Sequence, residues 1–221
     1  MIRNFLVAIA ALAASACSYG SAVDMAPMDA RLDRPVLPPG DYCEVEGDAA
    51  PFRIISAEDC VPITWDNEAR TYTMIDADDP EESMIVATAA VGQGLYLGQI
   101  EVETDQPDRY QMQVFIAKGS AFAIIPALGD EEMKALATRH PRVGFRNDNR
   151  SRPYIASGSR DRIKAFLLDA SKASLRKMKA EKETLDVGIL DSAGSVDHDA
   201  TKQQARDIEA VLKAARSLTP K

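Results

Sequence analysis

The sequence predicts an α+β protein in which an antiparallel β-meander, folded as a barrel or a two-layer sandwich, is followed by a C-terminal helical region. Two observations carry this prediction. Short apolar runs separated by turn residues recur from Asp41 to Leu128, and apolar residues with helical spacing replace them from Gly129 onward. We therefore expect a β-domain at 41–128 and a helical region at 129–221, packed on or beside it.

The predicted strands are short apolar runs bounded by residues that favour turns, such as Asp66-Asn67 and Gly92-Gln93-Gly94. Alternation is clearest from Tyr110 to Ile116, where Gln111 and Gln113 share one face. This pattern predicts one buried face and one face exposed to solvent. The runs cover about 42–46, 52–56, 61–65, 70–76, 84–91, 95–104, 110–117 and 120–125.

Three helices are predicted after Leu128. The first begins after Gly129 with acidic residues in its first turn, and His140-Pro141 ends it. The second begins at Ser159 and the third at about Asp199. Each of the last two carries one apolar stripe. The stripes consist of Ile163, Phe166, Leu167, Ala170, Ala173 and Met178 in the second helix, and of Ile208, Val211, Leu212, Ala215 and Leu218 in the third.

The N-terminal segment has the pattern of a secretory signal. One basic residue, Arg3, precedes an apolar run from Phe5 to Ala14, and the small residues Ser15-Ala16 come before Cys17. The apolar run is shorter than the roughly 20 residues that span a bilayer. We therefore expect residues 1–16 to be removed and the mature chain to be exported.

Ala14-Ser15-Ala16-Cys17 resembles the lipobox of bacterial lipoproteins. The resemblance implies that Cys17 becomes the lipidated first residue and anchors the chain to a membrane. The chain departs from the commonest motif, which has Leu where Ala14 stands. Ordinary signal-peptidase cleavage at the same bond is the alternative, and it would give a periplasmic protein. In either case we expect a location in the bacterial cell envelope.

The three cysteines favour the lipoprotein interpretation, since an odd number leaves one thiol over in an oxidising compartment. If Cys17 carries lipid, Cys43 and Cys60 remain and are expected to form a disulfide. That bond would stabilise the fold by about 3 kcal/mol. Two buried free thiols are the alternative, and they are less common in exported proteins.

Residues 17–40 are expected to form a flexible tether between the lipid and the domain. The segment is rich in Ala, Asp, Pro and Ser, has few large apolar residues and ends in Pro38-Pro39-Gly40. Such a composition buries little apolar area to offset the cost of ordering.

The net charge of −8 excludes nucleic acid as a favoured partner, because phosphate binding requires positive charge. Arg139-His-Pro-Arg, with Tyr154-Ile-Ala-Ser-Gly and the helix after it, resembles segments of uncharacterised envelope proteins of Gram-negative bacteria. The resemblance implies no activity.

No catalytic residue is assigned from the sequence. His140 and His198 have no nucleophile beside them, and a helix-capping role for His140 is the simpler interpretation. Ser174 and Lys177 match the Ser-x-x-Lys motif of penicillin-binding proteins and serine β-lactamases, but the companion motifs are absent. We expect both side chains to face solvent on the second helix.

No cofactor or metal site is predicted either. The acidic run Asp76–Glu82 breaks the order of an EF-hand loop, since Pro80 stands in the fifth place, and it is interpreted as a solvated turn. Gly92, Gly94 and Gly98 fail the dinucleotide-binding fingerprint.

A closed meander can enclose a small apolar ligand. The residues expected to line such a cavity, or to fill it as core, are Tyr96, Phe115, Phe122, Ile124 and Ile125. The sequence therefore favours an envelope protein that acts as a binding or structural-interaction module. The alternatives are a periplasm-facing hydrolase and a carrier of a small apolar ligand.

Overall fold

The computed structural model describes residues 18–47, 49–55, 60–75, 83–102, 109–146, 154–191 and 198–219. Thirteen strands and three helices make up this part of the chain. The strands are β1 (Tyr19–Ser21), β2 (Gly40–Glu46), β3 (Arg53–Ile54), β4 (Val61–Asp66), β5 (Thr71–Met74), β6 (Met84–Gly92), β7 (Leu95–Glu101), β8 (Tyr110–Lys118), β9 (Ala121–Ile125), β10 (Gly144–Arg146), β11 (Tyr154–Ser157), β12 (Val187–Leu190) and β13 (His198–Asp199). The helices are α2 (Asp130–Ala137), α3 (Arg160–Glu181) and α4 (Lys202–Ser217).

The strands form a closed antiparallel barrel, which confirms the predicted α+β class and decides between the barrel and the sandwich. Strands β4 to β9 pair in chain order as a meander. Strand β12 then joins β9 to β2, and β2 pairs with β4. The ring therefore has eight strands and no open edge.

The C-terminal region contributes more than helices to this ring. Val187–Leu190 lies after α3 in the chain, yet it pairs with both β2 and β9. The expected boundary at residue 128 therefore does not separate two folding units, because the barrel is incomplete without a strand from 129–221.

The helices begin close to the predicted positions. Ser159 is the N-cap of α3, and Thr201 is the N-cap of α4. The Thr201 side chain accepts a hydrogen bond from the Gln204 backbone, and the Gln204 side chain accepts one from the Thr201 backbone, which makes a capping box. The first predicted helix appears as α2.

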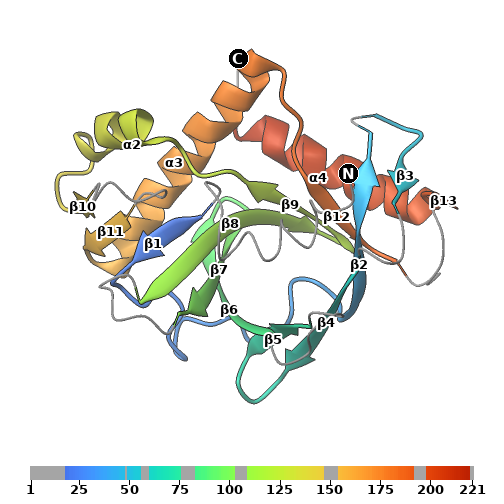
Figure 1. Ribbon diagram of the computed structural model, residues 1–221, viewed down its shortest axis with the longest axis horizontal. Helices are drawn as coiled ribbons and strands as arrows, with labels where there is room; N and C mark the ends of the chain where they lie inside the picture. The colour runs from blue at the N-terminus through green and yellow to red at the C-terminus, as the bar shows by residue number, and fades with distance from the viewer. Residues whose placement is uncertain are drawn as a thin grey trace.

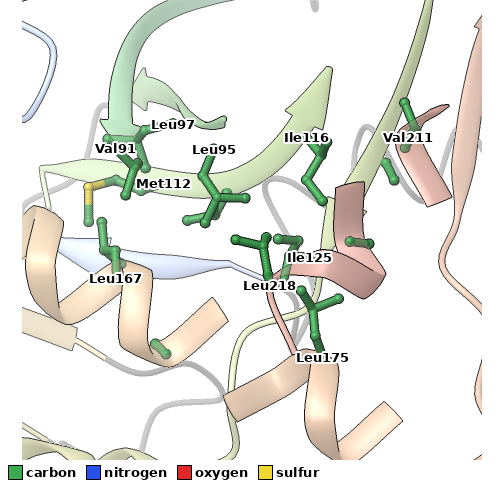
Figure 2. Close-up of a cluster of buried hydrophobic side chains, with 14 of the residues drawn as sticks. Val91, Leu95, Leu97, Met112, Ile116, Ile125, Leu167, Leu175, Val211 and Leu218 are labelled. Carbon is green, nitrogen blue, oxygen red and sulfur yellow. The ribbon is translucent and has the colours of Figure 1, made fainter. Parts of the chain in front are cut away.

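Helices α3 and α4 cover one side of the barrel, whereas β4 and β5 lie on the opposite side (Figure 1). Figure 2 shows Leu167 of α3 next to Met112 of the barrel wall, and Leu175 of the same helix next to Ile125 and Leu218. All of these side chains belong to one buried cluster, so this contact between helices and barrel is the main core of the protein.

A second buried cluster fills the inside of the barrel. It includes Tyr42, Ile63, Tyr72, Phe115 and Phe122, each from a different strand. Eight strands make a barrel just wide enough for side chains to fill. The barrel is therefore a packed element with an inner core and an outer core.

The prediction of an exposed glutamine face on β8 is wrong. Gln111 and Gln113 are 3% and 4% exposed, because their face of the strand points into the closed barrel. The opposite face, which carries Met112 and Val114, is covered by the helices. Closure therefore buries both faces of β8.

The prediction of a flexible tether is wrong for residues 18–40. Tyr19–Ser21 pairs with β8 and with β11. Farther along, the Met25 N–H donates to Gln99 Oε1 at 2.7 Å. Leu37 is buried inside the barrel end, where its N–H donates to the Tyr72 hydroxyl at 2.9 Å. Few apolar residues suffice here because the barrel supplies the surface against which they pack.

The predicted disulfide is present between Cys43 and Cys60. It joins β2 to the residue that precedes β4, and Cys43 lies in the outer core with 1% of its surface exposed. Cys17, the predicted lipidation site, lies outside the described residues.

Candidate ligand-binding groove

A groove with apolar lining lies where the C-terminal ends of α3 and α4 meet. The groove has a volume of about 610 Å³. Its apolar lining consists of Leu175, Met178, Leu185, Leu212 and Ala215. Leu175, Met178 and Ala215 are buried, while Leu185 and Leu212 are half-buried. The apolar floor of the groove is therefore reached from outside mainly at Leu185 and Leu212.

The end of α3 shapes one wall of the groove. Lys182 adopts a left-handed conformation with φ 59°, and its N–H donates to the Met178 carbonyl. The Glu183 N–H donates to the same carbonyl at 2.9 Å. This turn ends the helix and directs Thr184 and Leu185 back along the groove toward β12.

The rim carries three exposed cations: Lys179, Lys182 and Arg216. Within the described part of the chain, no ion pair engages any of them. Lys179 and Arg216 lie in the last turns of their helices, where cations offset the negative helix ends. Each helix end carries about half a negative charge. When Glu183 and the two helix ends are counted against the three cations, the groove keeps a net charge of about +1.

The inside of the barrel contains a second, much smaller hollow of about 50 Å³. Phe115, Phe122 and Ile124, which the sequence singled out, line it, and Tyr96 packs in the same inner cluster. Ile125 points the other way, into the outer core. The predicted cavity residues thus come together, with one exception, and they fill most of the space themselves.

Ser174 and Lys177 do not form a catalytic pair. Ser174 is 4% exposed, so the prediction that it faces solvent is wrong, since the apolar stripe of α3 is wide enough to include it. Lys177 is on the surface, as predicted, and its Nζ donates to Glu132 Oε1 of α2 at 2.7 Å. That ion pair lowers the pKa of Glu132 and raises that of Lys177, through the hydrogen bond that they share.

The two histidines each bind one carboxylate. His140 Nε2 lies 3.1 Å from Asp169 Oδ2, and the ring packs edge-on against Phe166. His198 Nε2 lies 3.2 Å from Asp191 Oδ2. His140 thus ties the loop after α2 to the side of α3, and His198 ties β13 to the end of β12.

Among the described residues, no group of three His, Cys, Asp or Glu side chains is placed to hold a metal ion. The acidic run Asp76–Glu82, which the sequence analysis interprets as a solvated turn, lies outside those residues. None of the described helices has the length and apolarity needed to cross a membrane. Comparison with protein-family models, curated proteins and solved structures finds no match.

The groove itself was not predicted as a site. Met178, Leu212 and Ala215 were recognised only as members of two apolar stripes, each complete in its own helix. The stripes do not indicate that the two helices converge at their C-terminal ends. The only signal in the sequence was the presence of Lys179 and Lys182 close to Met178, and a charged helix end explains these lysines equally well.

Proposed function

We propose that this protein is an exported, lipid-anchored binding module that holds a single-chain anionic amphiphile in the groove between α3 and α4. The observation that carries the proposal is an apolar floor beside three cationic side chains in a chain whose net charge is −8. The floor suits a hydrocarbon chain, and the rim suits a carboxylate or a sulfate head.

The size of the groove supports a small molecule as the occupant. Ligand pockets commonly measure about 300–1,000 Å³, and the groove, at about 610 Å³, lies in that range. Each buried CH₂ contributes about 0.8 kcal/mol, so six would contribute about 5 kcal/mol before the cost of association. The barrel interior, at about 50 Å³, is too small for such a chain.

The charge of the rim favours an anionic head over a cationic one. Acidic residues elsewhere on the chain are screened beyond about 8 Å at physiological ionic strength. Lys179, Lys182 and Arg216 therefore dominate the potential that a head group meets at the groove.

The lipid anchor rests on the lipobox-like residues before Cys17 and on the disulfide, which fits an oxidising compartment. Ser18, the next residue, is fully buried in the domain. A lipid on Cys17 would therefore hold the domain against the membrane without a spacer, close to a source of amphiphiles.

Titration calorimetry with dodecanoate tests the proposal. We expect saturable binding to one site, no binding of hexanoate at the same concentration, and weaker binding of dodecyltrimethylammonium. The Arg216→Glu variant should weaken dodecanoate binding by about tenfold, which equals about 1.4 kcal/mol.

Arg206→Glu is the matched control, since Arg206 is exposed on the same helix about 15 Å along its axis from Arg216 and does not line the groove. It should leave the affinity within about twofold of the wild type, because a remote surface charge is screened. Equal binding of the cationic and anionic amphiphiles, or equal effects of the two substitutions, would refute an anion-selective groove.

A further inference from the structure

We infer that the inside of the barrel is a second, separate binding site, for a compact molecule with an apolar body and one hydrogen-bonding group. The inference does not depend on the groove, since different residues form the two hollows. It rests on a cavity of about 50 Å³ and on one polar side chain that lines it.

That side chain is Thr88 of β6. It is 2% exposed, and no group among the described residues forms a hydrogen bond with its hydroxyl. The Thr88 carbonyl, in contrast, has a partner, because it accepts a hydrogen bond from the Leu32 N–H at 3.1 Å. A buried hydroxyl without a partner is unfavourable, and Val would fill the same space without that penalty. A ligand that pairs with the hydroxyl removes the penalty.

The other residues that line the cavity indicate how polar the rest of the ligand surface can be. Most of it is aliphatic or aromatic, and Gln113 is the other polar residue among the lining side chains. The aliphatic and aromatic lining consists of Leu37, Ile63, Tyr72, Met74, Val86, Phe115, Phe122 and Ile124. The ligand therefore has a single polar group and an otherwise apolar surface.

Size limits the ligand further. A cavity of about 150 Å³ binds benzene, whereas a water molecule needs only about 10–15 Å³. At about 50 Å³, this cavity takes a molecule smaller than benzene and larger than water. A three-carbon alcohol has this size and this balance of polar and apolar surface.

The residues that line the cavity are not equally covered. Met74 and Ile124 are half-buried, while Leu37, Tyr72 and Thr88 are buried. At the Leu37 side the Tyr72 hydroxyl accepts from the Leu37 N–H and donates to the Leu37 carbonyl at 3.1 Å, which holds this segment in place. Met74 is flexible, so entry beside it requires only a change of rotamer.

The test compares 1-propanol with 1-chloropropane, which has a similar shape and cannot donate a hydrogen bond. We expect nuclear Overhauser effects from 1-propanol to the methyl groups of Ile63 and Val86, and at least about fivefold weaker binding of 1-chloropropane, about 1 kcal/mol. Arg216→Glu should leave these effects unchanged, which separates this site from the groove.

Substitution of Thr88 completes the test. Thr88→Val should abolish the preference for 1-propanol and raise the melting temperature of the unliganded protein, whereas Thr88→Ser should keep the preference. Thr73→Val, a half-buried control on the neighbouring strand, should not change the preference. Absence of the Overhauser effects, or a lower melting temperature for Thr88→Val because water already satisfies the hydroxyl, would overturn the inference.

Discussion

Both ring nitrogens of His198 face oxygen atoms that can only accept hydrogen bonds. Nδ1 lies 3.0 Å from the Asp199 carbonyl, and Nε2 lies 3.2 Å from the Asp191 carboxylate. A neutral imidazole has one N–H, so only the protonated ring can donate to both acceptors. The hydrogen bond to the Asp199 backbone, followed by that to Asp191, raises the pKa of His198.

This arrangement predicts a pH-dependent contribution to stability. A raised folded-state pKa means that the contribution is fully present below the unfolded value of about 6.5 and is lost as pH rises through the folded value. Chemical denaturation of the wild type and of His198→Gln should therefore differ most near pH 5.5 and least above pH 8. A difference that grows with pH would contradict the assigned hydrogen bonds.

The sequence predicted the surroundings of individual side chains less well than it predicted the helices and strands. Cys43 and Cys60 could be paired because only two partners remained once Cys17 was assigned to lipid. The inward direction of Gln113 and the burial of Ser174 could not be predicted, since both depend on surfaces supplied by distant elements. A face that carries glutamines is exposed to solvent in an open sheet, whereas the same face is buried when the sheet closes into a barrel.

Phe166 is the largest fully buried side chain of helix α3. Phe166 is 0% exposed and lies in the outer core, with the His140 ring packed against it. The stripe that contains Phe166 was recognisable from its helical spacing alone. The helices and the longer strands were predictable because each repeats its pattern over several residues.

Substitution of that side chain should have a large effect. We expect Phe166→Ala to lower the free energy of unfolding by about 3–5 kcal/mol, through lost burial and the cavity left behind. Urea denaturation followed by circular dichroism measures the change. Phe145→Ala is a suitable comparison, because Phe145 is only half-buried at the edge of the same cluster, and it should cost clearly less. Equal losses would mean that α3 is not held mainly by Phe166.

Five short strands of the described chain escaped prediction for a physical reason: β1, β10, β11, β12 and β13. Tyr19–Ser21 and Val187–Leu190 have three and four residues, too few for an alternating pattern to stand out. Their strand conformation depends on pairing with β8, β2 and β9. The groove could not be predicted either, because its walls come from the ends of two helices that are distant in sequence.

At the scale of the whole molecule, the disulfide fixes one side of the barrel. It closes a loop with a sequence separation of 17, which should stabilise the folded state by about 3 kcal/mol by restricting the unfolded chain. We expect Cys43→Ala/Cys60→Ala to melt about 6–12 °C lower than the wild type. Addition of a reductant should lower the wild-type melting temperature and leave that of the double variant unchanged. A shift in both would point to an effect unrelated to this bond.

The proposed anchor also acts on the whole molecule. Cys17→Ala should move the protein from the membrane fraction to the soluble exported fraction, because a protein held by several acyl chains loses all of them. Cell fractionation and mass spectrometry of the N-terminal peptide measure this. Membrane retention of Cys17→Ala would mean that another part of the chain, or a partner, provides the attachment.

The place of β12 in the chain determines when the barrel can close. Strands β2 and β9 are complete long before Val187–Leu190 is synthesised, and each lacks its neighbour until that strand arrives. During that interval two unpaired edges are available for wrong pairing, between molecules as well as within one. A chain released before Val187 therefore cannot close the ring. For an exported protein, as proposed here, a chain that crosses the membrane unfolded cannot close its barrel until residues 187–190 have crossed as well.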